Sequence, residues 1–549
     1  MSRFLRFIVE REIAGRGSEL KEYTIGLEVF DRPKDYDPRV DPIVRVEARR
    51  LRSKLQTWYE CSNSPIRIEL PKGSYVPKFV PGTSGAPAVA THSPHGKEQA
   101  FSVAVLPFAN PSGNADAQYL SDGLTQQIIQ RLTRVPGLRV LGWTTASQMR
   151  ERQDVTNIAR ELNATHVLTG SVRQSGSRLR TFAQLVEPAT AAFLWSDSWD
   201  RPMGDLFQVE EDIAAAIVSS LGGHLGFAPG ASCQADSCDL YYRARWAWNQ
   251  RTGQGMRDSV ALLREAVAIA PDFALAWAGL ADSLAVMAQL GVVEPWEAIE
   301  HARQAAERAL ELSPELGEAE ASLGLITAVY DWEWNRAELH FQRAMQLNPG
   351  YPIAFFWYSL DYCAYRGYFR EAEAALAEAE VLDPLSSMIG TGRPYLLMLE
   401  RRYEEALSAS HRIMQLDPNF ARGLTMRGRI LIQCGKYREA VETLSSAYEL
   451  SGIPSTLGAL GQAWALNGET GKALEALRRL QEMRQRGFIQ ASCLAAVMIG
   501  LGDYEDAVAI LEHGAERREL SIAAIGAHPL YDPLRGMSRF DALVKRLGC

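Results

Sequence analysis

The hydrophobic positions near the start of the chain follow the period of an amphipathic helix within residues 42–60. The apolar stripe of this helix consists of Val44, Ala48, Leu51, Leu55 and Trp58. Two shorter helical patterns, at 4–15 and 23–30, come before it. Two β-rich runs joined by a turn at 71–74 come after it. This order predicts a small three-helix domain with a β-hairpin beside the third helix.

The next part of the chain alternates between strand and helix patterns. The helix expected at 118–135 has apolar residues at helical spacing, namely Leu120, Leu124, Ile128 and Leu132. The other predicted elements are strands at 102–108, 138–143 and 193–201, helices at 155–163 and 205–221, and a hairpin at 166–187 that turns at Ser175 and Gly176. Strands mixed with helices in this order predict an α/β sandwich.

The remaining half of the chain is repetitive. Alanines recur at one regular step and mark the second helix of each unit, and they are Ala302, Ala337, Ala372, Ala406, Ala440, Ala473 and Ala507. Helix-turn-helix units that repeat about every 34 residues resemble the tetratricopeptide repeat (TPR). We expect seven full repeats from about 274 to 520 and a degenerate one at 238–273, which together form an α-solenoid.

Stretches rich in Gly, Pro, Ala and Ser separate these parts. The predicted fold is therefore multidomain and mainly α, with a winged helix-turn-helix, a mixed α/β domain and a TPR solenoid. The predicted boundaries are 1–80 for the first domain, 81–100 for a flexible linker, 101–225 for the α/β domain, 226–237 for a joint, and 238–549 for the repeat array with its cap.

Charge is distributed unevenly along the chain. The net charge of the whole chain is −8, from 58 Lys and Arg against 66 Asp and Glu. Residues 1–80 hold 16 of the basic and 12 of the acidic residues, a net charge of +4, which leaves −12 for residues 81–549. Between Arg45 and Lys54 there are five basic residues and one carboxylate. This asymmetry indicates a polyanion partner for the first domain alone.

Several classes of protein are not indicated by the sequence. No apolar run is long enough to cross a bilayer, and the amphipathic start is not a signal peptide, so we expect a cytoplasmic protein. The seven scattered cysteines indicate neither a disulfide framework nor a metal site, and no cofactor is expected. Asp122, Asp197 and Asp200 are the candidate acidic cluster, but no histidine pair or phosphate-binding loop accompanies them. We therefore expect no enzyme activity.

The first domain resembles the winged-helix domains of the OmpR/PhoB type. The resemblance lies in "VRVEARRLRSKL" followed by "IRIELPKGSY", and it extends over about residues 3–80. In that family the helix enters the major groove of DNA and the hairpin flanks it. Such domains usually open with a small β-sheet, which is not found here, so the start is either truncated or typical of a subfamily without it. No receiver domain is present, and phosphorylation control is not implied.

The resemblance implies roles for eight residues of the helix and hairpin. Those expected to face bases or nearby phosphates are Arg45, Arg49, Arg50 and Ser53. Those expected to hold the DNA backbone are Arg52, Lys54, Lys72 and Tyr75. An arginine can bind guanine or phosphate through two parallel hydrogen bonds, which a lysine cannot. The implied partner is double-stranded DNA.

The middle domain resembles the TolB-like N-terminal domain over about residues 101–222. The phrases that carry the resemblance are "AVLPFAN", "YLSDGLTQQII", "VLTGSVRQSG", "AQLVEPAT" and "LWSDSWDR". In bacteria this domain often lies between a signalling or DNA-binding module and TPRs. The aromatic run at 355–369 in the repeats suggests a peptide or protein groove, with Trp357 as the residue expected to face the ligand.

These features predict a DNA-binding transcriptional regulator whose TPR array binds or senses a protein or peptide. The alternative is a non-catalytic TPR scaffold or adaptor whose winged helix is a protein-interaction module. Replacing Arg45, Arg49 and Arg52 by alanine distinguishes the two, because only the regulator would lose DNA binding. The operator, the effector, activation or repression, and the oligomeric state, including a possible homodimer, stay open.

Overall fold

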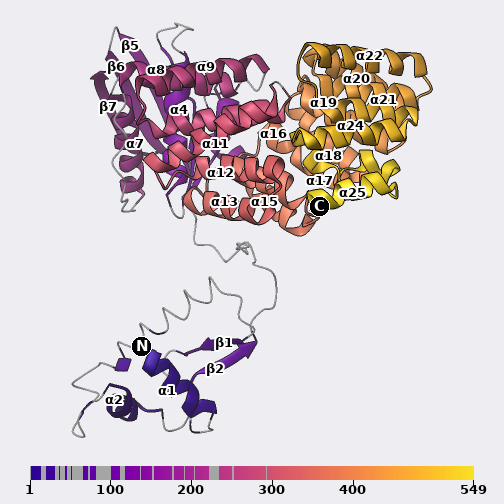
Figure 1. Ribbon diagram of the computed structural model, residues 1–549. Coiled ribbons are helices and arrows are strands. Elements are labelled where there is room, and N and C mark those ends of the chain that lie inside the picture. Colours follow the sequence, from indigo (N-terminus) through magenta and orange to yellow (C-terminus); the bar gives the residue numbers. More distant parts are fainter. Residues whose placement is uncertain are drawn as a thin grey trace. The chain divides into compact units, whose positions relative to one another are not determined.

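The chain forms two compact units, Met1–His95 and Gly96–Cys549. The computed structural model describes residues 2–13, 16, 20–30, 32, 36, 44–45, 48, 51, 66–71, 75–81, 101–111, 118–135, 138–150, 152, 154–175, 178–190, 192–202, 205–221, 234–249, 253–291 and 293–548. Within the second unit, a mixed sheet with its helices and a long helical array lie against each other (Figure 1).

The first unit contains two helices and a hairpin among its described residues. These elements are α1 (Ser2–Ile13), α2 (Glu22–Phe30), β1 (Ile66–Glu69) and β2 (Lys78–Pro81). The strands pair antiparallel, with Ile66 opposite Pro81 and Glu69 opposite Lys78. The two predicted helices and the predicted hairpin are therefore confirmed. Their shared core consists of Phe4, Ile8, Leu20, Ile25, Val29, Tyr36, Val44, Ala48, Leu51 and Leu70.

The second unit begins with a five-stranded mixed sheet. Its elements are β3 (Ser102–Val105), α4 (Gln118–Thr133), β4 (Arg139–Val140), α5 (Trp143–Ser147), α6 (Val155–Leu162), β5 (His166–Ser175), β6 (Arg178–Glu187), β7 (Ala192–Pro202) and α7 (Leu206–Ser220). The strand order is β4-β3-β5-β6-β7. β3 pairs parallel with β4 and β5, whereas β6 pairs antiparallel with both neighbours. The predicted alternation of strands and helices is confirmed.

Paired helices make up the rest of the second unit. The described elements are α8 (Ala235–Asn249), α9 (Gly253–Ile269), α10 (Ala274–Gln289), α11 (Pro295–Leu312), α12 (Gly317–Ile326), η4 (Thr327–Asp331), α13 (Trp334–Leu347), α14 (Pro352–Trp357), η5 (Tyr358–Cys363), α15 (Phe369–Leu382), α16 (Ser387–Gly390), α17 (Gly392–Leu399), α18 (Tyr403–Leu416), α19 (Ala421–Gln433), α20 (Tyr437–Ser451), α21 (Pro454–Leu466), α22 (Thr470–Arg486), α23 (Ala491–Leu501), α24 (Tyr504–Glu516), η6 (Leu520–Ala524), η7 (Pro529–Leu534) and α25 (Ser538–Leu547).

The predicted repeats correspond to these helix pairs. From α10 to α24 the described chain forms seven pairs, and α8 with α9 forms the degenerate pair before them. All seven alanines that mark the period are fully buried. A small side chain at this position lets the second helix of each pair approach its neighbours closely.

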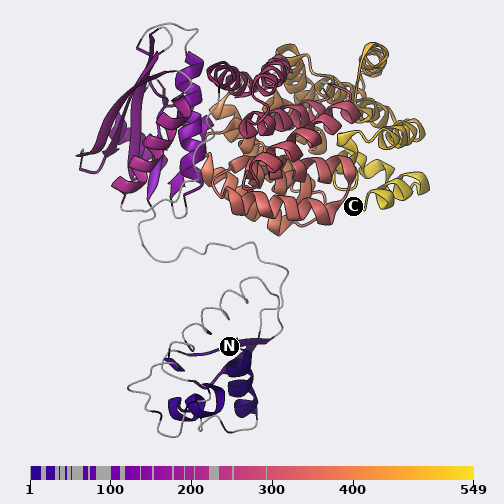
Figure 2. The same cartoon turned by 60° about the vertical axis from the view of Figure 1, so that its left-hand side comes forward.

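The middle domain packs directly on the array. Helix α4 lies between the sheet and α8, as Figure 2 shows from the side. The side-chain amide of Gln127 donates a hydrogen bond of 2.8 Å to the hydroxyl of Tyr241 on α8. Further along, Asp383 accepts hydrogen bonds from the backbone N–H and the hydroxyl of Thr145, at 2.8 and 2.6 Å. Residues 226–233 of the predicted joint lie outside the described residues, and the helices on either side of it, α7 and α8, belong to one compact unit.

Tyr242 and Glu210 lie at the buried centre of the joint between the middle domain and the array, where α4, α7 and α8 pack together. Tyr242 is fully buried on α8, and its hydroxyl donates a hydrogen bond to the carboxyl group of Glu210 on α7. Arg131 of α4 lies 3.4 Å from the other oxygen of Glu210. A Cβ added to Gly123 of α4 would overlap the Tyr242 ring, so only glycine permits this approach. Three helices of two domains thus meet at one tyrosine.

The buried Glu210 makes stability depend on pH. Burial raises the pKa of its carboxyl group to about 8, and the charge of Arg131 only partly opposes this effect. The folded chain therefore keeps a proton that the unfolded chain loses near the ordinary pKa of 4.5. The contribution of Glu210 to stability is fully present below pH 4.5 and is lost as the pH rises through 8. We expect Glu210→Gln to remove this part of the decline, measured by urea unfolding at several pH values.

Other buried groups also make the stability of the chain depend on pH, and the same measurement records their contributions. Burial raises the pKa of Asp361 to about 7 and that of Asp282 to about 6, so both add to the decline at rising pH. Burial lowers the pKa of His528 to about 3, so its contribution is instead lost as the pH falls below 6.5. Asp212→Asn, at a partly exposed carboxylate of the same helix that accepts a hydrogen bond of 3.2 Å from Gln208, is the matched control. Identical pH slopes for Glu210→Gln and the unsubstituted chain would contradict the prediction.

Candidate nucleic-acid interface and partner-binding surface

The described positions of the arginine-rich helix confirm part of its apolar stripe. Val44 and Ala48 are fully buried, and Leu51 is 4% exposed. All three belong to the core that α1 and α2 share. Leu55 and Trp58, the other members of the predicted stripe, lie outside the described residues. The apolar face of this segment therefore packs on the rest of the first unit, as the period predicts.

Two of the predicted DNA-contacting residues meet at one carboxylate. Glu22, the first residue of α2, accepts a hydrogen bond of 2.7 Å from Nε of Arg45. The same oxygen, Oε1, accepts a hydrogen bond of 2.7 Å from the hydroxyl of Tyr75. The Glu22 carboxylate raises the pKa of the Arg45 guanidinium, which is 53% exposed. Glu22 thus joins the arginine-bearing segment to the hairpin, and it was not among the predicted site residues.

The other predicted DNA-contacting residues stay predictions. Arg49, Arg50, Arg52, Ser53, Lys54 and Lys72 lie outside the described residues. Their proposed roles rest on the sequence and on the resemblance given above. What the structure adds is the position of Arg45 and Tyr75 on either side of Glu22.

The three aspartates of the candidate acidic cluster are engaged separately. Asp122 on α4 accepts a hydrogen bond of 2.5 Å from Arg150. Asp200 on β7 accepts one from Arg178 at 2.7 Å and another from Arg180 at 3.1 Å, and these bonds lower the pKa of its carboxyl group. Asp197 accepts from the backbone N–H of the residue that follows it. Each carboxylate therefore has a local structural role.

The proposed groove residue Trp357 lies inside the array. It is 4% exposed, and its neighbours Phe355 and Phe356 are also buried. Nearby, the rings of Tyr358 and Tyr362 stack with centroids 5.3 Å apart. The aromatic run thus packs neighbouring helices together, and Trp357 has almost no surface for a ligand. The prediction for this residue is therefore wrong, since the sequence pattern does not distinguish a packing face from a groove face.

First helices from repeats that are not neighbours in sequence meet through polar groups. The amide of Gln289 on α10 donates a hydrogen bond of 3.0 Å to Asp361 on η5. Asp361 is 5% exposed, and burial raises the pKa of its carboxyl group to about 7, an effect that the charge of the nearby Arg422 on α19 only partly opposes. The hydroxyl groups of Tyr365 and Tyr395 lie 3.5 Å apart beside them. We call these five residues the inner cluster.

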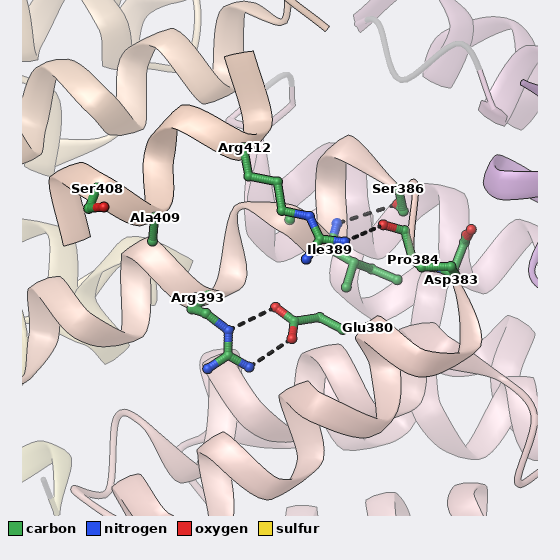
Figure 3. Close-up of a pocket in the computed structure, with 10 residues that line it drawn as sticks. Glu380, Asp383, Pro384, Ser386, Ile389, Arg393, Ser408, Ala409 and Arg412 are labelled. Carbon is green, nitrogen blue, oxygen red and sulfur yellow. Dashed lines mark hydrogen bonds and ion pairs between the residues drawn. The ribbon is translucent and has the colours of Figure 1, made fainter. Parts of the chain in front are cut away.

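A small pocket of about 130 Å³ lies close to the joint with the middle domain (Figure 3). Arg393 donates hydrogen bonds to both carboxylate oxygens of Glu380, at 3.1 and 2.7 Å. Arg412 donates to the carbonyl of Pro384 at 3.1 Å. Because both guanidinium groups already have partners in the chain, the pocket is a weak candidate for binding an anionic ligand.

Among the described residues, no group of three or more His, Cys, Asp and Glu side chains could hold a metal ion. No helix in that part of the chain is both long and apolar enough to span a bilayer. Cys238 is disulfide-bonded, which the scattered cysteines did not indicate, whereas Cys363, Cys434 and Cys493 are free thiols.

Two parts of the chain match known families. Residues 98–215 match the second domain of HilA/YgeH-like transcriptional regulators. Residues 421–452, which contain α19 and α20, match the tetratricopeptide repeat. The second unit therefore combines a HilA/YgeH-like transcriptional regulator domain with TPRs.

Curated relatives and solved structures extend this similarity. Transcriptional regulator HilA of Salmonella typhimurium is 22% identical over 435 residues, which cover 76% of this chain and 75% of HilA. Putative adenylate cyclase 3 of Rhizobium meliloti is 30% identical over 217 residues, which cover 38% of this chain and 36% of that protein. The chain thus spans about a third of that relative's length. The human IFIT1 dimer with PPP-AAAA is 14% identical, with a TM-score of 0.40, over 62% of this chain and 77% of its own.

Proposed function

We propose that this chain is a DNA-binding transcriptional regulator whose TPR array binds a protein partner. The observation that carries the proposal is the similarity to transcriptional regulator HilA, which extends over 76% of the chain. This similarity also includes sequence outside the TPRs. TPRs alone would not indicate a regulator, because scaffolds of many kinds share them. We further propose that the protein works in the cytoplasm, where its DNA partner would be accessible.

The first unit supports the DNA-binding part of the proposal. Two helices, a hairpin and a buried apolar stripe at Val44, Ala48 and Leu51 are the elements that a winged helix-turn-helix requires. We propose that this unit is of the OmpR/PhoB type, with Arg49, Arg50 and the neighbouring basic residues on the DNA. Glu22 then holds Arg45 and Tyr75 in place beside the duplex.

The middle domain and the array support a role in transmission. We propose that the middle domain is TolB-like and passes partner binding in the array to the first unit. Its hydrogen bonds to α8 and to Asp383 couple it firmly to the array. The similarity to a putative adenylate cyclase covers only 38% of the chain.

DNA binding is expected to weaken steeply as salt rises. About five phosphate contacts would give a slope near −4.5 for log K against log [salt], or a loss of roughly 500-fold between 50 and 200 mM. The measurement is a selection of bound genomic fragments, followed by fluorescence anisotropy on the enriched fragment across that range. A chain that enriches no fragment at 50 mM salt would contradict the proposed function.

The scaffold or adaptor remains the second candidate, and one observation favours it. Arg45, which we expected to face DNA, is already paired with Glu22 at 2.7 Å. An arginine in a protein-interaction module would show such pairing without any DNA partner. This candidate predicts no retention on DNA at any salt concentration, with the TPR partner bound as before.

A further inference from the structure

The turn inside each of the seven helix pairs from α10 to α24 contains a residue with a left-handed backbone. At five of these turns this residue is glycine, with φ between 70° and 86°. These glycines are Gly291, Gly367, Gly435, Gly468 and Gly502. At the last four a Cβ would meet no heavy atom within 4 Å, so crowding does not explain the glycine there. The backbone conformation itself disfavours any residue with a side chain.

Two turns carry a large side chain in this position. Trp332 has a φ of 61° and Arg401 a φ of 63°. Trp332 lies one repeat before Gly367 and Arg401 one repeat after it. Only two other non-glycine residues of the described chain have a positive φ. One is Asn163, which ends α6, and the other is Arg518, whose guanidinium lies 5.4 Å from the Trp332 ring. Strain retained at such positions points to a function for the side chains.

Arg401 uses its side chain to hold a distant segment of the chain. Its Nη2 lies 2.7 Å from Oδ1 of Asp532, and its Nε lies 3.3 Å from Oδ2. Its Nη1 donates a hydrogen bond of 2.8 Å to the carbonyl of Ala527. A glycine at position 401 would fit the backbone better but would make none of these contacts.

Neighbouring turns hold the same segment. The indole N–H of Trp334 donates a hydrogen bond of 2.8 Å to the carbonyl of Leu547. Arg366, in the turn between those of Trp334 and Arg401, donates a hydrogen bond to the carbonyl of Gly548. We call Trp332, Trp334, Arg366 and Arg401 the clasp surface. Three successive turns thus bind residues 527–548 through side chains.

The bound segment has two different sides. Its apolar residues Tyr531, Leu534, Phe540, Leu543 and Leu547 are buried against α23 and α24, the helix pair next to it in sequence. Its contacts with Arg401 and Arg366 are hydrogen bonds and an ion pair. About a third of each side chain in the Arg401–Asp532 pair is exposed, so water and salt weaken this bond. The polar contacts of the segment with Arg401 and Arg366 can therefore break while its apolar residues stay packed on α23 and α24.

We propose that the clasp surface is a binding site for an acidic peptide segment of a partner protein, and that residues 527–548 occupy it until the partner displaces them. This inference rests on the proposed protein-binding role of the array. Two guanidinium groups and two indole rings suit a peptide with a carboxylate beside aliphatic residues. The chain's own segment presents that chemistry, with Asp532 between Leu530 and Leu534.

Release of the segment has a structural consequence for the inner cluster. His528, in the same segment, packs its ring 6.1 Å from that of Tyr395. Each TPR is stabilised mainly by its sequence neighbours, so the helix pairs stay folded when contacts between distant repeats are lost. Opening would therefore expose Tyr395 and the polar groups beside it to the incoming partner.

Asp532→Arg tests the release, because it places a positive charge beside Arg401 and Arg535, both of which pair with Asp532. We expect hydrogen exchange of the backbone amides at 399–403 to rise at least tenfold. The double change Arg401→Asp/Asp532→Arg restores an ion pair with reversed sign and should return exchange to within twofold of the original. Asp541→Arg makes the same charge change on α25 outside the clasp and should have no effect. Asp532→Asn removes the ion pair without adding repulsion, and it should also raise hydrogen exchange at 399–403.

A labelled peptide of residues 526–536 tests the binding site itself. We expect the Asp532→Arg chain to bind this peptide at least tenfold more tightly than the original chain does, measured by fluorescence anisotropy. It should bind the same peptide with asparagine in place of the aspartate at least tenfold more weakly. Unchanged exchange in both Asp532 variants, or equal binding of the two peptides, would overturn the proposal. Neither measurement contains DNA, so failure here is distinguishable from failure of the proposed DNA binding.

Discussion

Replacing Arg45, Arg49 and Arg52 together by alanine is expected to weaken DNA binding at least about 100-fold. A charge-assisted contact to a phosphate or base contributes roughly 1–3 kcal/mol, and three are removed. The change at Arg45 also leaves the Glu22 carboxylate without its partner, which adds repulsion from the DNA phosphates. The measurement is fluorescence anisotropy with the enriched fragment at fixed salt, after circular dichroism has shown intact folding.

The salt dependence of the variant provides a second readout. If the three arginines contact phosphates, the slope of log K against log [salt] should become shallower by about 2.7. The matched control replaces Arg308, Arg336 and Arg478 by alanine. Each of these is exposed and paired with a glutamate in the array. Equal losses in the two triple variants, or no loss in either, would favour the scaffold.

Replacing Tyr242 by alanine is expected to lower the free energy of unfolding by about 4 kcal/mol. Removal of a fully buried aromatic ring from a packed interface leaves a cavity, and this typically costs roughly 3–5 kcal/mol. The Tyr242 ring also stacks on Phe207 of α7, with centroids 5.7 Å apart. Its loss leaves Glu210 buried without its hydroxyl partner. The measurement is the urea midpoint followed by tryptophan fluorescence.

Tyr242→Phe separates the role of the ring from that of the hydroxyl group. It keeps the stacking on Phe207 and the contact with Gly123 and removes only the hydrogen bond to Glu210. We expect a loss of about 1 kcal/mol at pH 6, where Glu210 is protonated because its pKa is about 8. If Tyr242→Ala and Tyr242→Phe lowered the free energy of unfolding by the same small amount, the Tyr242 ring would not stabilise the packing of the middle domain on the array.

The order of helices and strands could be predicted from the sequence because each element has a local period. In α4 the spacing of Leu120, Leu124 and Ile128 predicts one buried face, and that face is buried. The pattern does not predict that Gln126 and Gln127 are buried as well. Gln127 donates a hydrogen bond to Tyr241 on α8, a helix that comes much later in the sequence and packs on α4.

The candidate sites could be predicted only in part. The basic window identified Arg45, but Glu22 is 23 residues away and has no pattern that links it to Arg45 or Tyr75. In the aromatic run, the sequence pattern indicated Trp357, which is buried, and gave no sign of Asp361 and Tyr365 of the inner cluster. One signal was present in the sequence, since Trp332 and Arg401 stand where other repeats have glycine.

The sequence by itself determined the repeats, their regular spacing and the apolar faces that stack them, since each depends on contacts between neighbours along the chain. Only the tertiary structure decided that Arg401 meets Asp532, 131 residues away, and that Thr145 meets Asp383, 238 residues away. A local period specifies which side of a helix is buried. The small rotation from each repeat to the next accumulates along the array, and this sum selects which distant turns and helices come together.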